Sequence, residues 1–111
     1  MRLNNIAIPV SDLASAKALY STLLGAEPYV DEPYYVGFKT DSVEVGLDPS
    51  GHRAGHTGPV AYWAVEDLRS ALEGLVAAGA EVLAEPRDVG GGRLVASVKD
   101  SDGNPFGLVE G

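Results

Sequence analysis

Cysteine is absent from the 111-residue sequence, and this absence excludes structural disulfides, thiolate zinc sites and thiol nucleophiles. Cationic side chains are few: eight Lys and Arg stand against 16 Asp and Glu, which gives a net charge of −8. A field of this sign repels polyphosphates and anionic lipids, so we expect neither nucleic acid nor a membrane as a partner. The same field favours a cationic small molecule or peptide.

Long apolar runs are also missing, since no stretch approaches the roughly 20 residues of a membrane span. The opening residues 1–5 carry no apolar run of the kind found in a signal peptide. We therefore expect a cytoplasmic location. The length fits one folded domain, and the 45% hydrophobic content is typical of a packed globular protein.

The most informative feature that is present is an internal repeat. Residues 10–16 read VSDLASA, and residues 65–71 read VEDLRSA, with five of seven positions identical at an offset of 55. The Gly-Ala-Glu of residues 25–27 returns at residues 79–81, and the Val-Gly-Leu of residues 45–47 is echoed by the Phe-Gly-Leu of residues 106–108. Each half therefore contains the same units in the same order.

Each half begins with an apolar run that leads into an Asp-Leu pair, and the aspartate suits the start of a helix. The apolar stripes of residues 13–24 and 68–76 predict two helices, with Gly25 and Gly79 at their C-terminal ends. Three β-prone segments follow each helix. The strands expected are Leu3 to Val10, Glu27 to Asp31, Tyr34 to Lys39, Val43 to Asp48, Pro59 to Val65, Glu81 to Pro86, Arg93 to Lys99 and Pro105 to Glu110.

The chain, with its two β-α-β-β-β halves, resembles the vicinal oxygen chelate superfamily of glyoxalases, bleomycin-resistance proteins and extradiol dioxygenases. The segments that carry the resemblance are residues 5–13 (NIAIPVSDL), 17–20 (KALY) and 100–105 (DSDGNP). The resemblance covers essentially the whole chain. It implies an α+β fold in which two modules, 1–48 and 59–111, curl mixed sheets around a shared cavity, with residues 49–58 as a connector. It specifies the fold well and the function poorly, because the superfamily hosts many chemistries.

Metal-dependent members of the superfamily place one ligand on the first strand and one on the last strand of each module. The matching positions here are Asn5, Gly46, Val60 and Gly107. Three of the four have no donor side chain, so no metal or other cofactor is expected. Glu44 shares a strand face with Gly46 but lacks carboxylate or imidazole partners.

Two further metal motifs are weak. His52 and His56 are spaced for a helical zinc site, yet glycines and a nearby proline predict a loop, and we expect both histidines to be exposed or at a rim on a mobile connector. Residues 100–104 (DSDGN) lack the acid of a calcium loop and read as a tight turn, while residues 90–92 (GGG) read as a flexible hairpin.

Strand alternation sorts the remaining side chains between the cavity and the helices. Trp63 falls on the helix side and is expected in the core. Small residues on the cavity side are expected to leave room for a ligand. Tyr35 and Tyr62 are expected to stack on this ligand or to donate hydrogen bonds to it. The ligand-binding residues predicted in this way are Asn5, Tyr35, Glu44, Gly46, Val60, Tyr62, Arg93, Ser97 and Gly107.

These features favour a homodimeric, metal-free protein that binds or sequesters a cationic aromatic natural product, nearest in character to the bleomycin-resistance branch of the superfamily and thus linked to antibiotic resistance. A metal-dependent glyoxalase-type lyase or isomerase, or a dioxygenase-like enzyme, is the alternative, with Glu44, His52 or His56 recruited as ligands. Acid-base catalysis without a metal, by Glu44 with Tyr62 or Arg93, is a third possibility. No residue is assigned a catalytic role.

Overall fold

A computed structural model describes all 111 residues and divides into two compact units. The first unit is Asn5–Val60, and the second combines Met1–Asn4 with Ala61–Gly111. Each repeats the same β-α-β-β-β order of elements, as the sequence predicted, so the fold is α+β. No helix is long and apolar enough to cross a membrane.

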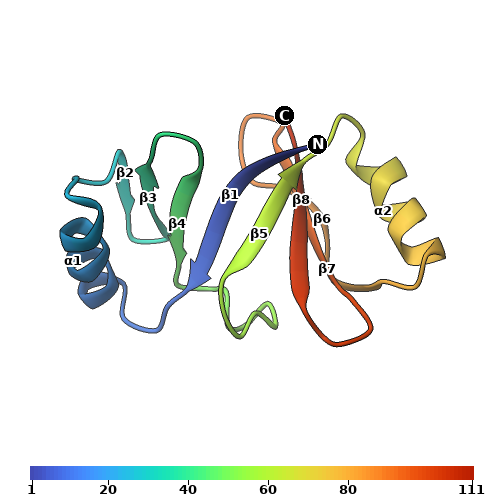
Figure 1. The fold of residues 1–111 in the computed structure, drawn as a ribbon, viewed down its shortest axis with the longest axis horizontal. Helices are drawn as coiled ribbons and strands as arrows, with labels where there is room; N and C mark the ends of the chain where they lie inside the picture. Colours follow the sequence, from blue (N-terminus) through green and yellow to red (C-terminus); the bar gives the residue numbers. More distant parts are fainter. The chain divides into compact units, whose positions relative to one another are not determined.

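The first unit packs helix α1 against one face of a mixed sheet (Figure 1). In this sheet β1 and β4 are parallel, whereas β3 runs antiparallel to β4 and β2 antiparallel to β3. The strand order is β2-β3-β4-β1. The elements are β1 (Arg2–Pro9), α1 (Leu13–Leu24), β2 (Val30–Glu32), β3 (Tyr35–Lys39) and β4 (Glu44–Asp48).

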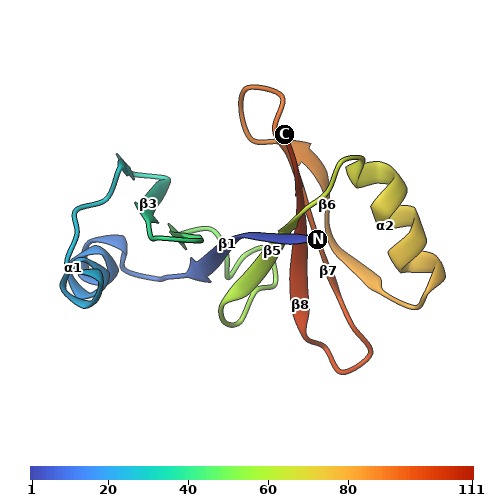
Figure 2. The ribbon, with the colours of Figure 1, turned by 45° about the horizontal axis from the view of Figure 1, so that its top comes forward.

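The second unit has the same topology, with helix α2 beside the strands β6, β7 and β8 (Figure 2). Strands β5 and β8 are parallel, and β7 is antiparallel to both β8 and β6. The strand order β5-β8-β7-β6 therefore repeats that of the first unit. The elements are β5 (Val60–Ala64), α2 (Leu68–Ala77), β6 (Glu81–Asp88), β7 (Leu94–Lys99) and β8 (Pro105–Glu110).

Both helices begin at the predicted aspartates. The carboxylate of Asp12 accepts a hydrogen bond from the Ser15 backbone N–H, and that of Asp67 accepts one from the Ser70 backbone N–H. These bonds satisfy amides that the first helical turn leaves free. Gly25 ends α1 in the left-handed conformation at φ 64°, as expected of a C-terminal glycine.

Each helix covers an apolar core on one side of its sheet. In the first unit Val36, Phe38 and Leu47 are buried beneath α1. In the second, the buried cluster includes Leu68 and Leu108, and Trp63 packs against it as predicted. Because strand residues alternate between faces, the intervening side chains lie on the other side of each sheet, which we call the helix-free face.

The two glycine- and aspartate-rich segments form turns. Gly90, Gly91 and Gly92 all have positive φ angles and connect β6 to β7. Asp100 closes the turn before β8, because its backbone N–H donates to the Asn104 carbonyl at 3.0 Å. The hairpin at residues 90–92 and the tight turn at residues 100–104 are thus confirmed.

The connector residues 49–58 form a series of turns, and the expected exposure of both histidines is wrong for one of them. His52 is exposed, but His56 is only 4% exposed. The backbone N–H of His56 donates to the Gly51 carbonyl at 3.0 Å, so the chain folds back on itself here and carries the imidazole inward. The glycines that predicted a loose loop instead permit a tight one.

Candidate functional site

The helix-free face of the first unit gathers the polar side chains of β3 and β4. Tyr35, Gly37 and Lys39 alternate with the buried Val36 and Phe38 along β3. On β4, Glu44 and Gly46 alternate with the core residues Val45 and Leu47 in the same way. This arrangement follows from the period-2 pattern, as predicted.

Glu44 is the centre of a cluster with two tyrosines. The Tyr29 hydroxyl donates to Oε1 of Glu44, and the Tyr35 hydroxyl donates to Oε2. Hydrogen bonds from neutral hydroxyls to an ionised carboxylate are among the stronger ones in proteins, and two of them fix the orientation of the group. We call these three residues the Glu44 cluster.

A cation already lies against one ring of the Glu44 cluster. The Lys39 ammonium is 4.8 Å from the centroid of the Tyr29 ring, within the range of a cation–π interaction. Tyr29 keeps 51% of its surface exposed. The ring therefore offers aromatic surface to solvent beside a carboxylate.

Gly46 lies under the Tyr35 ring. A Cβ atom placed on Gly46 would lie 2.6 Å from both Cε1 and Cζ of Tyr35, far inside van der Waals contact. Only a glycine lets the aromatic ring pack flat on the backbone of the neighbouring strand. This close approach positions the Tyr35 hydroxyl over Glu44.

The second unit repeats the close approach with a different tyrosine. A Cβ atom on Gly107 would lie 2.7 Å from Cζ of Tyr62, which is the direct partner of Gly107 in the parallel pairing of β5 with β8. The expectation that glycines leave room for a ligand is therefore wrong at Gly46 and Gly107. Tyrosine rings fill both spaces, because flat aromatic surface packs well against bare backbone.

The second unit lacks the acid. By the Gly-Leu echo, the counterpart of Glu44 is Pro105, since each stands two residues before its glycine. The position that corresponds to Glu44 therefore holds no carboxylate in the second unit. The sequence repeat itself shows this difference between the two halves.

The other predicted site residues occupy varied surroundings. Asn5 pairs with Glu44 in the β1–β4 register and so shares its face. Arg93 is exposed and donates from Nη2 to Oδ1 of Asn4 at 2.7 Å. Val60 and Ser97 are almost completely buried, at 0% and 1% exposure.

Tyr29 was missed by the sequence analysis. It precedes β2, and its backbone N–H donates to the Gly37 carbonyl at 2.9 Å, which extends the β2–β3 hairpin by one residue. The predicted strand from Glu27 to Asp31 covers Tyr29. If the Glu27–Asp31 segment is paired with the Tyr34–Lys39 segment as a hairpin, both Tyr29 and Tyr35 lie near Gly37.

The side chains present do not fit the metal site implied by the fold. No group of three or more His, Asp or Glu residues is arranged to hold a metal ion anywhere in the 111 residues. Gly46 and Gly107 carry no donor, and tyrosine rings lie over both. These residues therefore do not form the metal centre of the fold.

Comparison with known families accounts for this architecture. Residues 2–108 match the family described as the Glyoxalase/Bleomycin resistance protein/Dioxygenase superfamily. The chain belongs to this superfamily. The resemblance inferred from the repeat is thus confirmed, whereas the metal-free branch within it stays a prediction.

Several solved structures share the fold at low sequence identity. A glyoxalase/bleomycin resistance protein/dioxygenase superfamily member from Vibrio splendidus aligns with a TM-score of 0.72 at 18% identity, covering 96% of this chain and 97% of that one. Methylmalonyl-CoA epimerase from Streptomyces coelicolor, solved with 2-nitronate-propionyl-CoA, aligns with a TM-score of 0.70 at 20% identity, covering 99% and 94%.

A third similar structure carries a different description. A chain described as NAD-dependent benzaldehyde dehydrogenase from Legionella pneumophila aligns with a TM-score of 0.78 at 14% identity, covering 96% of both chains. At such identities these likenesses show the fold alone. No curated protein sequence matches the chain.

Proposed function

We propose that the protein binds a small cationic, aromatic molecule without a metal, at the helix-free face of its first unit. The observation that carries this proposal is the Glu44 carboxylate held by the hydroxyls of Tyr29 and Tyr35. An oriented anion flanked by aromatic rings suits a ligand that is both positively charged and planar.

The carboxylate of Glu44 can accept more hydrogen bonds than it receives from protein hydroxyls. An ionised carboxylate has about four acceptor sites, and the two tyrosines use one on each oxygen. An ammonium or guanidinium group of a ligand could therefore bind while both tyrosines stay in place. Because the acceptor is already oriented, little ordering is needed when the ligand binds.

The rings supply the second part of recognition. Tyr29 is half exposed and carries the Lys39 ammonium against its face, which shows that the ring is accessible to a cation. A ligand cation would take the place of Lys39, whose side chain is free to move into solvent because it is exposed. The net charge of −8 adds long-range attraction for such a ligand.

A calorimetric titration with metal-free bleomycin, a cationic aromatic compound, tests the proposal. We expect stoichiometric, salt-sensitive binding to the wild type and affinity at least about tenfold weaker for Glu44→Gln, because a hydrogen bond to a charged group contributes about 1.5–3 kcal/mol. Glu85→Gln is the matched control. It removes one negative charge from an exposed residue of β6 and should leave affinity unchanged.

Absence of heat and of a thermal shift across a panel of cationic aromatic antibiotics would count against the proposal. Equal weakening by Glu44→Gln and Glu85→Gln would point instead to net charge alone. A rise in thermal stability on adding nickel, zinc or manganese would favour the metal-dependent lyase or isomerase.

A second candidate is metal-free proton transfer at the same cluster. A carboxylate beside two phenols resembles a general base with adjacent hydrogen-bond donors, and similar folds include methylmalonyl-CoA epimerase. If Glu44 acts as such a base, incubation with methylmalonyl-CoA in D2O should exchange the α-proton of the substrate, and Glu44→Gln should abolish the exchange. Binding of that thioester without exchange would reject this candidate.

A further inference from the structure

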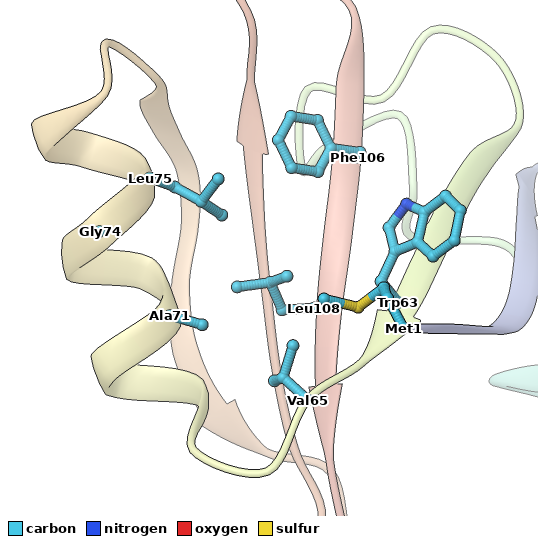
Figure 3. Close-up of a pocket in the computed structure, with 8 residues that line it drawn as sticks. All are labelled: Met1, Trp63, Val65, Ala71, Gly74, Leu75, Phe106 and Leu108. Carbon is cyan, nitrogen blue, oxygen red and sulfur yellow. The ribbon is translucent and has the colours of Figure 1, made fainter.

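A hollow lies on the helix-covered face of the second unit's sheet, between α2 and strands β5 and β8 (Figure 3). Its volume is about 390 Å³, which is within the range of small-molecule sites. Every residue that lines it is apolar, and the lining consists of Met1, Trp63, Val65, Ala71, Gly74, Leu75, Phe106 and Leu108. We call this hollow the α2 groove.

One polar atom interrupts the apolar lining. The indole nitrogen of Trp63 lies on the edge of the ring turned toward Phe106 and Leu108 (Figure 3). Indole N–H is a donor only, and the indole N–H of Trp63 donates no hydrogen bond within the protein, although the backbone of Trp63 pairs with β8. A ligand that carries one acceptor could satisfy this donor while the apolar walls bury the rest of its surface.

Charge at the mouth of the groove restricts the ligand further. A shallower hollow continues from Val65 and Ala71 past the carboxylates of Glu66 and Asp67. Acidic side chains beside an apolar site repel fatty acids and other anionic amphiphiles. The groove therefore suits neutral molecules rather than carboxylates.

We propose that the α2 groove binds a neutral, largely apolar small molecule of about bicyclic size through one hydrogen bond from Nε1 of Trp63. This site is independent of the Glu44 cluster, because it lies in the other unit and on the helix-covered face of the sheet. Its volume of about 390 Å³ is sufficient for a molecule of this size.

Gly74 offers a way to close the groove without disturbing the core. A Cβ atom at this position meets nothing within 4 Å, although Gly74 lines the groove. Glycine is a poor helix former, so a larger residue should also favour α2. Gly74→Leu is therefore expected to fill the hollow while the protein stays folded.

The experiment uses three probes with one carbon skeleton, namely 2-decalone, decalin and decalin-2-carboxylate. Trp63 is the only tryptophan, so its indole N–H gives a single NMR cross-peak that reports directly on the groove. We expect 2-decalone to shift this peak saturably and to bind about tenfold more tightly than decalin, which lacks the acceptor. Decalin-2-carboxylate should bind more weakly than 2-decalone at pH 7.

Two variants separate the groove from nonspecific binding. Gly74→Leu should remove binding of 2-decalone, whereas Ala77→Leu, which adds the same side chain outside the groove, should not. Trp63→Phe, measured by calorimetry, should abolish the preference for 2-decalone over decalin. It keeps an aromatic ring but removes the donor.

The proposal is overturned if neither 2-decalone nor decalin shifts the indole peak, or if Gly74→Leu binds as well as the wild type. It is also overturned if sedimentation shows a dimer that Gly74→Leu dissociates, because a second copy would then cover the groove. Bleomycin binding through the Glu44 cluster should be unaffected by Gly74→Leu, so the two proposals fail separately.

Discussion

The ring of Tyr62 rests directly on the backbone of Gly107, so that a Cβ atom on this glycine would come within 2.7 Å of Cζ of the ring. Tyr35 rests on Gly46 in the same way. Each unit of the duplicated fold thus joins a tyrosine to a glycine at the centre of its helix-free face.

Replacing Gly107 by alanine should destabilise the protein, because the methyl group and the Tyr62 ring cannot occupy the same space. Overpacking of this kind costs about 1–3 kcal/mol of unfolding free energy. Gly74→Ala is the control, since its Cβ meets no atom within 4 Å and it should stabilise α2 by about 1 kcal/mol. Urea denaturation of both variants measures the difference, and equal effects would contradict the close approach.

Tyr35→Phe should lower the unfolding free energy by about 1 kcal/mol, since the ring still covers Gly46 but Glu44 loses one donor. Tyr34→Phe is the neighbouring control, because Tyr34 is 71% exposed and makes no hydrogen bond. Thermal unfolding of the two single variants should therefore differ. A Tyr35→Phe protein as stable as Tyr34→Phe would show that the bond to Glu44 adds nothing to stability.

Removal of either helix cap should weaken the fold by a similar amount. Asp12→Ala and Asp67→Ala each remove a side-chain acceptor for a free helical amide, at a cost of about 1 kcal/mol. Serine at either position should restore most of the loss because it can cap in the same way. Circular dichroism during thermal unfolding gives the comparison, and a serine variant no better than alanine would argue against capping.

Acid should reduce the stability contributed by Asp100. Hydrogen bonds from the Asn104 backbone N–H, then from its side-chain amide, and from the Asp102 backbone hold the pKa of Asp100 below its ordinary value of 3.8. A carboxyl with a depressed pKa stabilises the folded state above its unfolded-state pKa, and this contribution disappears as the pH falls through the folded-state value.

The measurement compares Asp100→Ala with the wild type by urea unfolding at several pH values. The difference in stability should be largest near neutral pH and should shrink as the pH falls below 3.8. Asp102→Ala removes a carboxylate that accepts no hydrogen bond, so its difference from the wild type should change less with pH. A constant difference for Asp100→Ala would contradict the hydrogen-bonded turn.

Much of the fold was predictable because its signals are local. The Asp-Leu pairs that begin both helices, Gly25 at the end of α1 and the alternation along β3 and β4 all depend on neighbours in sequence. The last strand was placed at its observed bounds, Pro105 to Glu110. Strand ends elsewhere shifted by up to three residues, because pairing with a partner strand decides where a ladder stops.

The candidate site was harder to predict, because its contacts join residues that are distant in sequence. Tyr35 and Glu44 were placed on one face by alternation, but nothing local indicates that Tyr29 reaches the same carboxylate across 15 residues. The burial of His56 was missed for a local reason. Its glycine-rich surroundings permit a loose loop and a tight turn equally well.

The two tyrosine-glycine pairs also restrict the substitutions that the two units can accept during evolution. Tyr35 reaches Gly46 from β3, whereas Tyr62 reaches Gly107 from β5. The position equivalent to Tyr62 in the first unit holds Ala7, and the position equivalent to Tyr35 in the second unit holds Val95. Moving the tyrosine from the strand on one side of the glycine to the strand on its other side takes two substitutions. A variant with only one of these substitutions would either place two rings over one glycine or leave the glycine backbone uncovered. We therefore expect single substitutions to keep each tyrosine on its present strand.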